Sequence, residues 1–185
     1  KGGKLFALGN EQSLILSTKG DGSIAFYTGE KVDKNWVTES NINFKNIPEV
    51  KNWFVKSFPD WDVMWHELFT AEKITIIPRP LFHYPSSQHW EPQSNLTIIG
   101  DAAHRMPPYA GEGVNMAMLD ALELSEILLD DKSGDTKASF SAYETKMLKR
   151  AAEVTTMTMV NTVALHSSGA LQYILEMFRS FDQQA

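Results

Sequence analysis

The chain has 185 residues, of which 43% are hydrophobic and 22% charged, a balance typical of a folded globular protein. Its 17 basic and 23 acidic residues give a net charge of −6 with no basic stripe, which argues against a nucleic-acid partner. The absence of cysteine excludes disulfides, thiolate metal sites and cysteine nucleophiles. No apolar stretch is long enough to span a bilayer and no signal peptide is visible, so we expect a cytoplasmic protein with no membrane partner.

The first thirty residues show the pattern of an antiparallel meander. Apolar runs at residues 5–8, 14–16 and 24–27 predict three short strands. The sequence Lys-Gly-Asp-Gly at residues 19–22 is a turn signal between the last two strands.

Two helices are predicted next. Pro48 suits a first helical position, and Pro59 ends that helix. Asp60 is a candidate cap for a second, short helix over residues 61–68. The Trp, Phe and Met side chains in both segments recur at helical spacing, which favours hydrophobic packing over a binding function.

Two further strands are predicted before the most informative part of the chain. Residues 73–84 read as a strand that is interrupted by Pro78 and Pro80, so it is expected at a sheet edge or bent. Residues 86–94 read as a loop. Residues 95–99 form a short apolar run that predicts a buried strand.

The C-terminal part is predicted to be helical. Apolar residues at helical spacing predict one helix over residues 113–129 and a longer one over residues 136–163, with a turn at residues 130–135. The small residues Ser167-Ser168-Gly169 break the pattern, and a last amphipathic helix is predicted over residues 171–181.

Residues 100–115 combine several features that favour a ligand site. Asp101 follows the predicted strand, where a carboxylate can accept hydrogen bonds from ligand hydroxyls, and Gly100 lets a ligand approach closely. Two prolines make a rigid wall, and a glycine-spaced helix start points backbone N–H groups outward, at the end that attracts negative charge. The candidate cofactor-binding residues are Gly100, Asp101, Pro107, Pro108, Gly111, Glu112, Gly113, Val114 and Asn115.

This stretch resembles the second flavin-binding motif of FAD-dependent aromatic-hydroxylase-type monooxygenases. The shared pattern is Gly-Asp-Ala-Ala-His at residues 100–104, the two prolines, the glycines with Asn115, and Asp120-Ala121 on the following helix. Weaker similarity includes Phe-Pro-Asp-Trp at residues 58–61 and the run at residues 95–99. The nearest branch is that of the tetracycline-inactivating monooxygenases, although residues 23–28 lack the substrate-contacting His of those members.

The resemblance implies particular roles for these residues. Asp101 would accept a hydrogen bond from the ribityl chain of FAD, and Pro107 and Pro108 would line the flavin ring. The backbone of residues 111–115 would face the pyrimidine edge of the isoalloxazine. NADPH would reduce the FAD, and O2 would then be used to hydroxylate an aromatic or polycyclic small molecule, with no side chain required as a catalytic acid or base.

The resemblance also implies how the chain is organised. We expect an α+β or α/β fragment in which residues 1–94 form a substrate-domain sheet with short helices. Residues 95–130 would form the strand–turn–helix end of an FAD-binding domain, and residues 131–185 the C-terminal long helices. The family's Gly-x-Gly-x-x-Gly fingerprint for the ADP half of FAD is absent. The chain therefore corresponds to the C-terminal part of such an enzyme, with the N-terminal half as its missing partner, and we expect it to be inactive alone.

Other interpretations remain open on the sequence. The same flavin motif occurs in reductases, halogenases and epoxidases, and the chain could also be an inactive packing or dimerisation module. Phe6, Phe26 and Tyr109 are candidate substrate contacts, whereas His104 is interpreted as a structural hydrogen-bonding residue. His83 and His89 match no strong metal pattern, so we predict no metal site.

Overall fold

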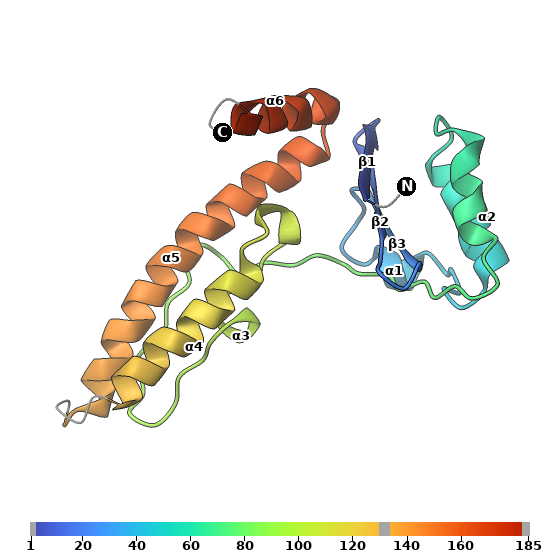
Figure 1. The fold of residues 1–185 in the computed structure, drawn as a ribbon. Coiled ribbons are helices and arrows are strands. Elements are labelled where there is room, and N and C mark those ends of the chain that lie inside the picture. The colour runs from blue at the N-terminus through green and yellow to red at the C-terminus, as the bar shows by residue number, and fades with distance from the viewer. Residues whose placement is uncertain (1–2, 130–133, 183–185) are drawn as a thin grey trace. The chain divides into compact units, whose positions relative to one another are not determined.

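The structure is a computed structural model that describes residues 3–129 and 134–182. It divides into two compact units, which we describe one at a time: Lys1–Pro80 with His166–Ala185 as unit 1, and Leu81–Leu165 as unit 2. The described strands lie in one antiparallel sheet and helices make up most of the remaining regular structure, so the predicted α+β class is confirmed (Figure 1). Residues 130–133 of the predicted turn lie outside the described residues.

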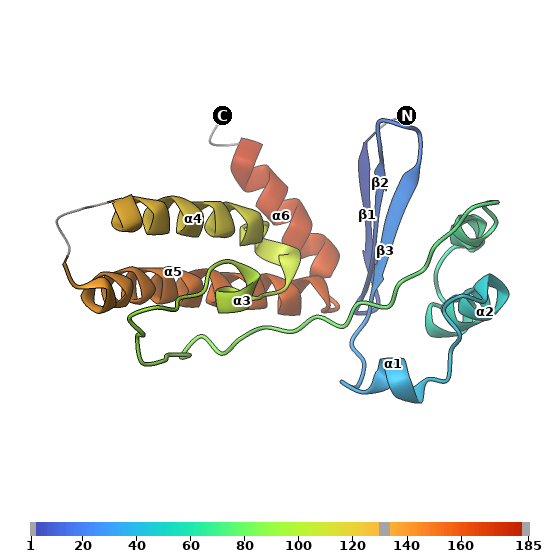
Figure 2. The ribbon, with the colours of Figure 1, turned by 90° about the horizontal axis from the view of Figure 1, so that it is seen from below.

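Unit 1 begins with the predicted meander, in the order β1 (Lys4–Gly9), β2 (Gln12–Thr18) and β3 (Ile24–Gly29). Figure 2 shows the three strands side by side. The β1–β2 turn is formed by Asn10 and Glu11, both with positive φ, as a tight two-residue hairpin requires. The predicted turn residues 19–22 join β2 to β3, where the Lys19 N–H donates a hydrogen bond to the Ser23 carbonyl at 2.8 Å.

Helix α2 (Ile47–Ser57) carries one side of the core of unit 1. Its start follows from Asn46, whose side chain accepts a hydrogen bond from the Glu49 N–H, and from Pro48 in the first turn. Val50 and Phe54 lie on one face at helical spacing and pack with Leu14 of β2. The sheet and α2 therefore share one hydrophobic cluster, rich in aromatic rings.

The second predicted short helix is a 3-10 helix, η1 (Val63–Phe69), and a short α1 (Trp36–Glu39) precedes α2. The sequence pattern did not predict α1. The cap of η1 is Asp62, whose carboxylate accepts the Met64 N–H at 2.8 Å, rather than the expected Asp60. Asp60 instead accepts a hydrogen bond from Asn10 in the β1–β2 turn.

Unit 1 ends with helix α6 (Ala170–Asp182), which contacts β1. Ala170 and Ile174 are buried on the side of α6 that packs inward. His166, just before α6, is buried and lies 3.5 Å from the Ser13 hydroxyl of β2 (Nε2 to Oγ). The predicted helix break at residues 167–169 is therefore the point at which the chain returns to the sheet.

Unit 2 is helical and built on a long antiparallel pair (Figures 1 and 2). The pair consists of α4 (Gly113–Leu129) and α5 (Thr136–Leu165), as the apolar periodicity predicted. Two single-turn elements precede it: α3 (Asp101–His104) and the 3-10 turn η2 (Pro108–Ala110). The core contains Ala103 from α3 and Tyr143 and Met147 from α5.

Two predicted strands are wrong. Residues 73–84 and 95–99 are both described, and neither has a strand assignment. A strand needs a ladder of backbone hydrogen bonds to a neighbour. Among the described residues neither segment joins the sheet, and the bond from the Tyr84 N–H to the Arg105 carbonyl at 3.0 Å does not extend into a ladder. Leu96 is 63% exposed, so the apolar run at residues 95–99 is also not buried as expected.

No helix within residues 3–129 and 134–182 combines the length and apolar character that crossing a membrane requires.

Candidate functional site

The candidate site lies in unit 2 and begins at Gly100. This residue has φ +58° and ψ −141°, a region that side chains rarely adopt. A Cβ at this position would lie 3.2 Å from the Ala117 Cβ on α4. In the structure, the missing side chain of Gly100 makes room for helix α4; the sequence-based prediction that it also lets a ligand approach stays a prediction.

Asp120 on α4 holds the turn at residues 100–104 from inside the unit. Its carboxylate accepts hydrogen bonds from the Gly100 N–H at 3.0 Å and from Arg150 of α5 at 2.8 Å, and it pairs with His104 Nε2 at 2.5 Å. Asp120 is fully buried and His104 is 2% exposed. His104 therefore forms the structural hydrogen bond predicted for it.

The charges around Asp120 balance one another. Arg150 also reaches both carboxylate oxygens of Glu123, at 3.0 and 3.2 Å, and Glu123 pairs with Lys146 at 2.7 Å. Burial acts to raise the pKa of Asp120, but the bonds from Gly100, His104 and Arg150 outweigh it and hold this pKa below its usual value. Asp120 is thus a buried carboxylate kept ionised by its partners.

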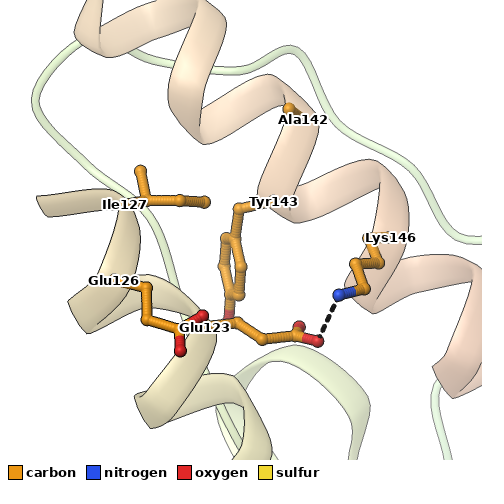
Figure 3. A pocket seen from close by; sticks show the side chains of 6 residues that line it. All are labelled: Glu123, Glu126, Ile127, Ala142, Tyr143 and Lys146. Carbon is orange, nitrogen blue, oxygen red and sulfur yellow. Dashed lines mark ion pairs between the residues drawn. The ribbon is translucent and has the colours of Figure 1, made fainter. Parts of the chain in front are cut away.

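A cavity of about 220 Å³ adjoins this network between α4 and α5 (Figure 3). Figure 3 shows Tyr143 reaching from α5 toward Glu123 on α4, beside the Glu123–Lys146 ion pair. Burial, followed by the nearby Asp120 charge, raises the pKa of Tyr143 well above its usual range. The phenol therefore stays protonated and adds no charge to the network.

The predicted cofactor-binding residues differ in their access to solvent. Asp101, the first residue of α3, is exposed, whereas Pro107 is buried and Pro108 is exposed. The helix start is open as well, since Val114 is 72% exposed. The other predicted residues divide into buried Gly100, half-buried Glu112 and Gly113, and exposed Gly111 and Asn115.

The N-terminus of α4 contributes positive potential to the site. The first N–H groups of a helix have no acceptor within the helix, and the helix dipole adds about half a positive charge there. Gly111 has φ +73° and, like Gly113, has no described atom within 4 Å of a Cβ position, so a ligand can approach the backbone closely. Glu112 accepts a hydrogen bond from the Asn115 side chain at 3.2 Å.

The fold brings Asp101 and this helix end into one region. Gly100 lies against Ala117, which is about one helical turn after Gly113. An exposed carboxylate that can accept hydrogen bonds therefore lies near an exposed helix end that can donate them. Such a surface suits a ligand with hydroxyl groups at one end and an anionic or carbonyl-bearing edge at the other.

The three candidate substrate residues are not brought together within one unit. Phe26 packs against Phe69 with ring centroids 5.6 Å apart, as an ordinary member of the unit 1 core. Phe6 on β1 is 40% exposed. Tyr109 belongs to unit 2, is half-buried, and has its pKa raised by burial.

No group of three or more His, Asp or Glu side chains suited to a metal ion occurs among the residues that the structure describes. His83 and His89 are exposed in the chain before α3.

Sequence reasoning missed the residues that support the site from behind. Asp120 was part of the recognised motif but without a role; its position on the apolar face of a helix was the available signal. Glu123 and Arg150 carried no signal, because their pairing joins positions 27 residues apart. Thr158 and Asn161 of α5 were missed for the same reason, and both bond to the loop at residues 107–110.

Comparison with known proteins places these features in context. Residues 87–158 match the family model of an FAD binding domain. The match includes every predicted cofactor-binding residue, the Asp120 network and Thr158. It therefore supports FAD binding by unit 2.

Curated relatives point in the same direction. The FAD-dependent monooxygenase phnB of Penicillium herquei is 37% identical over 92 residues, covering 48% of this chain and 22% of phnB. A kynurenine 3-monooxygenase of Xanthomonas campestris is 30% identical over 132 residues, covering 71% of this chain and 28% of that enzyme. The chain thus spans about a quarter of the length of these relatives, and they support the general family of FAD-dependent monooxygenases.

A solved structure is similar in fold. An HpxO variant of Klebsiella pneumoniae, in complex with FAD, aligns with 98% of this chain and 44% of its own chain at a TM-score of 0.60. The sequence identity is 16%, so this likeness concerns the fold alone.

Proposed function

We propose that this chain provides the surface of an FAD-dependent monooxygenase that binds the ribityl and isoalloxazine part of FAD. One observation carries the proposal: exposed Asp101 and the open N-terminus of α4 lie on one region of a unit that matches an FAD binding domain. Relatives named as FAD-dependent monooxygenases support the reaction class.

Each part of this surface has a proposed role. Asp101 accepts hydrogen bonds from the ribityl hydroxyls, and the exposed Pro108 ring lines one side of the isoalloxazine. The backbone from Gly111 to Asn115 faces the pyrimidine edge, where a helix N-terminus stabilises negative charge. The open space at Gly111 and Gly113 fits a flat ring system that must approach the backbone.

The reductant and the substrate also belong to the proposal. Bound FAD would supply the electron transfer and O2 activation that hydroxylation needs. We propose NADPH as the reductant and an aromatic or polycyclic small molecule as the substrate. The resemblance to aromatic hydroxylases supports this choice, as does the name of the kynurenine 3-monooxygenase relative. The tetracycline-inactivating branch remains the nearest proposed one.

The proposed role of Asp101 as a hydrogen-bond acceptor for FAD can be tested with the Asp101→Ala variant of the full-length protein. Loss of a charge-assisted acceptor is expected to weaken FAD binding at least tenfold, because such a bond contributes about 1.5–3 kcal/mol. Flavin retained after purification and the Kd of FAD for the apoprotein are the measurements.

Glu153→Ala is the matched control, since Glu153 is an exposed carboxylate on α5 outside the predicted site. It should retain flavin like the wild type. Equal FAD affinity of the Asp101→Ala variant and the wild type would rule out the role of Asp101.

A further inference from the structure

The loop at residues 107–111 is anchored to α5 by two side chains. Thr158 Oγ1 donates a hydrogen bond to the Pro107 carbonyl at 2.8 Å and accepts one from the Ala110 N–H at 3.1 Å. Asn161 Nδ2 donates to the Tyr109 carbonyl at 2.9 Å. Three backbone groups of one short loop are thus held by two residues one turn apart on a helix.

The loop has few other means of holding itself in place. Pro107 and Pro108 have no N–H, so neither can donate a backbone hydrogen bond. A threonine inside a helix usually bonds to the carbonyl four residues earlier, as Thr156 does with Ala152 at 2.8 Å. Thr158 directs both the donor and the acceptor capacity of its hydroxyl to the loop instead. It is fully buried, so no water competes for these bonds.

The anchored and open sides of the loop are distinct. Pro107 is buried beside Thr158, whereas Pro108 and Gly111 are exposed. The loop therefore presents Pro108 and Gly111 outward, while the Pro107 carbonyl, the Tyr109 carbonyl and the Ala110 N–H are bonded to α5. Thr158 and Asn161 fix the loop to α5, and the bond from the Gly111 N–H to the Pro108 carbonyl at 3.0 Å closes the turn within it.

We propose that Thr158 and Asn161 are positioning residues for bound flavin. By fixing the loop on α5, they set where the Pro108 ring and the Gly111 backbone meet the isoalloxazine. This inference rests on the proposed function, because it assumes that the exposed side of the loop faces the cofactor. Neither residue is proposed to touch the flavin.

Thr158→Val in the full-length protein tests the inference, because valine keeps the shape of threonine but removes its hydroxyl. We expect the Kd for FAD to rise about tenfold, equivalent to about 1.4 kcal/mol, and the visible absorbance and circular dichroism of the bound flavin to change. Thr158→Ser restores the hydroxyl and should return both properties toward the wild type. The control Thr156→Val, at an exposed position on the same helix, should leave both unchanged.

The outcomes separate the two proposals. If the wild type takes up no FAD, the proposed function and this inference both fail. If the wild type binds FAD and Thr158→Val gives the same Kd and flavin spectrum, the inference alone is overturned, even if the melting temperature of the variant falls. If Thr158→Val does not fold, Asn161→Asp replaces it as the test, because this substitution removes the donor to the Tyr109 carbonyl. An unchanged Kd for FAD and an unchanged flavin spectrum in that variant would overturn the inference.

Discussion

Asp120 joins three other parts of unit 2. Its carboxylate contacts the backbone of Gly100, the ring of His104 and the guanidinium of Arg150. A buried charge is costly unless it is paired and hydrogen-bonded, and here all three partners contribute. The turn that presents Asp101 to solvent is therefore held in place by a charge on the opposite, inner side of the chain.

The lowered pKa of Asp120 predicts acid sensitivity. A carboxylate whose pKa is lower in the folded state than in the unfolded chain stabilises the fold above its unfolded pKa, near 3.8, and loses that contribution as the pH falls through the folded value. The free energy of unfolding should thus decrease below about pH 4. Urea unfolding at stepwise lower pH, followed by circular dichroism, measures this decrease.

The acid dependence of the wild type can be compared with that of the Asp120→Asn variant. This variant should lose about 3 kcal/mol of stability at pH 7, because the positive charge of Arg150 loses a buried partner, and its acid dependence should be smaller than that of the wild type. Glu126→Gln removes an exposed carboxylate from the same helix and should behave like the wild type. An acid dependence of Asp120→Asn as steep as that of the wild type would contradict the assignment.

Gly100 is constrained by both its backbone and its neighbour. Gly100→Ala is expected to lower the free energy of unfolding by about 1–3 kcal/mol, since the positive φ is strained for alanine and the new Cβ would crowd Ala117. Thermal or urea unfolding measures the loss. Gly113→Ala is the control, because Gly113 has an ordinary φ and open space around it. Equal stability of the two variants would argue against the strain.

At the scale of elements, the long helices and the three-stranded meander follow local patterns, whereas the strands predicted at residues 73–84 and 95–99 do not form. The helices α4 and α5 match the residues that apolar periodicity predicted, because each helix satisfies its own backbone hydrogen bonds. Residues 95–99 have strand composition but lack a ladder partner among the described residues. They are held instead by a side-chain bond, from the Thr97 hydroxyl to Glu144 on α5 at 2.8 Å.

Helix α2 provides the test of the unit 1 core. Phe54 is fully buried and stacks on Phe58 with ring centroids 4.6 Å apart. Phe54→Ala should lower the free energy of unfolding by about 3–5 kcal/mol, because it removes buried apolar surface and leaves a cavity. Val55→Ala, next to it but 39% exposed, should cost much less. Urea unfolding measures both changes. Similar losses in the free energy of unfolding for the two variants would contradict the assignment of Phe54 to the core of unit 1.

At the scale of the whole molecule, the two units are interleaved in sequence. Unit 1 takes residues from both ends of the chain, so α5 belongs to unit 2 and α6 to unit 1. Each unit has its own hydrophobic cluster. The FAD-domain match lies within unit 2 and the three-stranded sheet within unit 1. The division of residues 1–94, 95–130 and 131–185 that the sequence suggested stays a prediction.

Much of this protein could be predicted from the sequence because the signals are local. Turn residues and short apolar runs predicted the meander, apolar periodicity predicted the long helices, and the spacing of residues 100–115 indicated a flavin motif. The match to an FAD binding domain supports that cofactor. The specific contacts assigned to Asp101, Pro107 and the helix start remain predictions.

Only the tertiary structure decided which residues support the site and which are accessible. Asp120 with Arg150, and Thr158 with Pro107, pair across 30 and 51 residues, and such distances leave no trace in local composition. The structure also separates buried Pro107 from exposed Pro108, although the two are chemically alike. Local sequence patterns indicate how a segment forms its own backbone hydrogen bonds. Burial and long-range pairing depend instead on which other segments pack beside it.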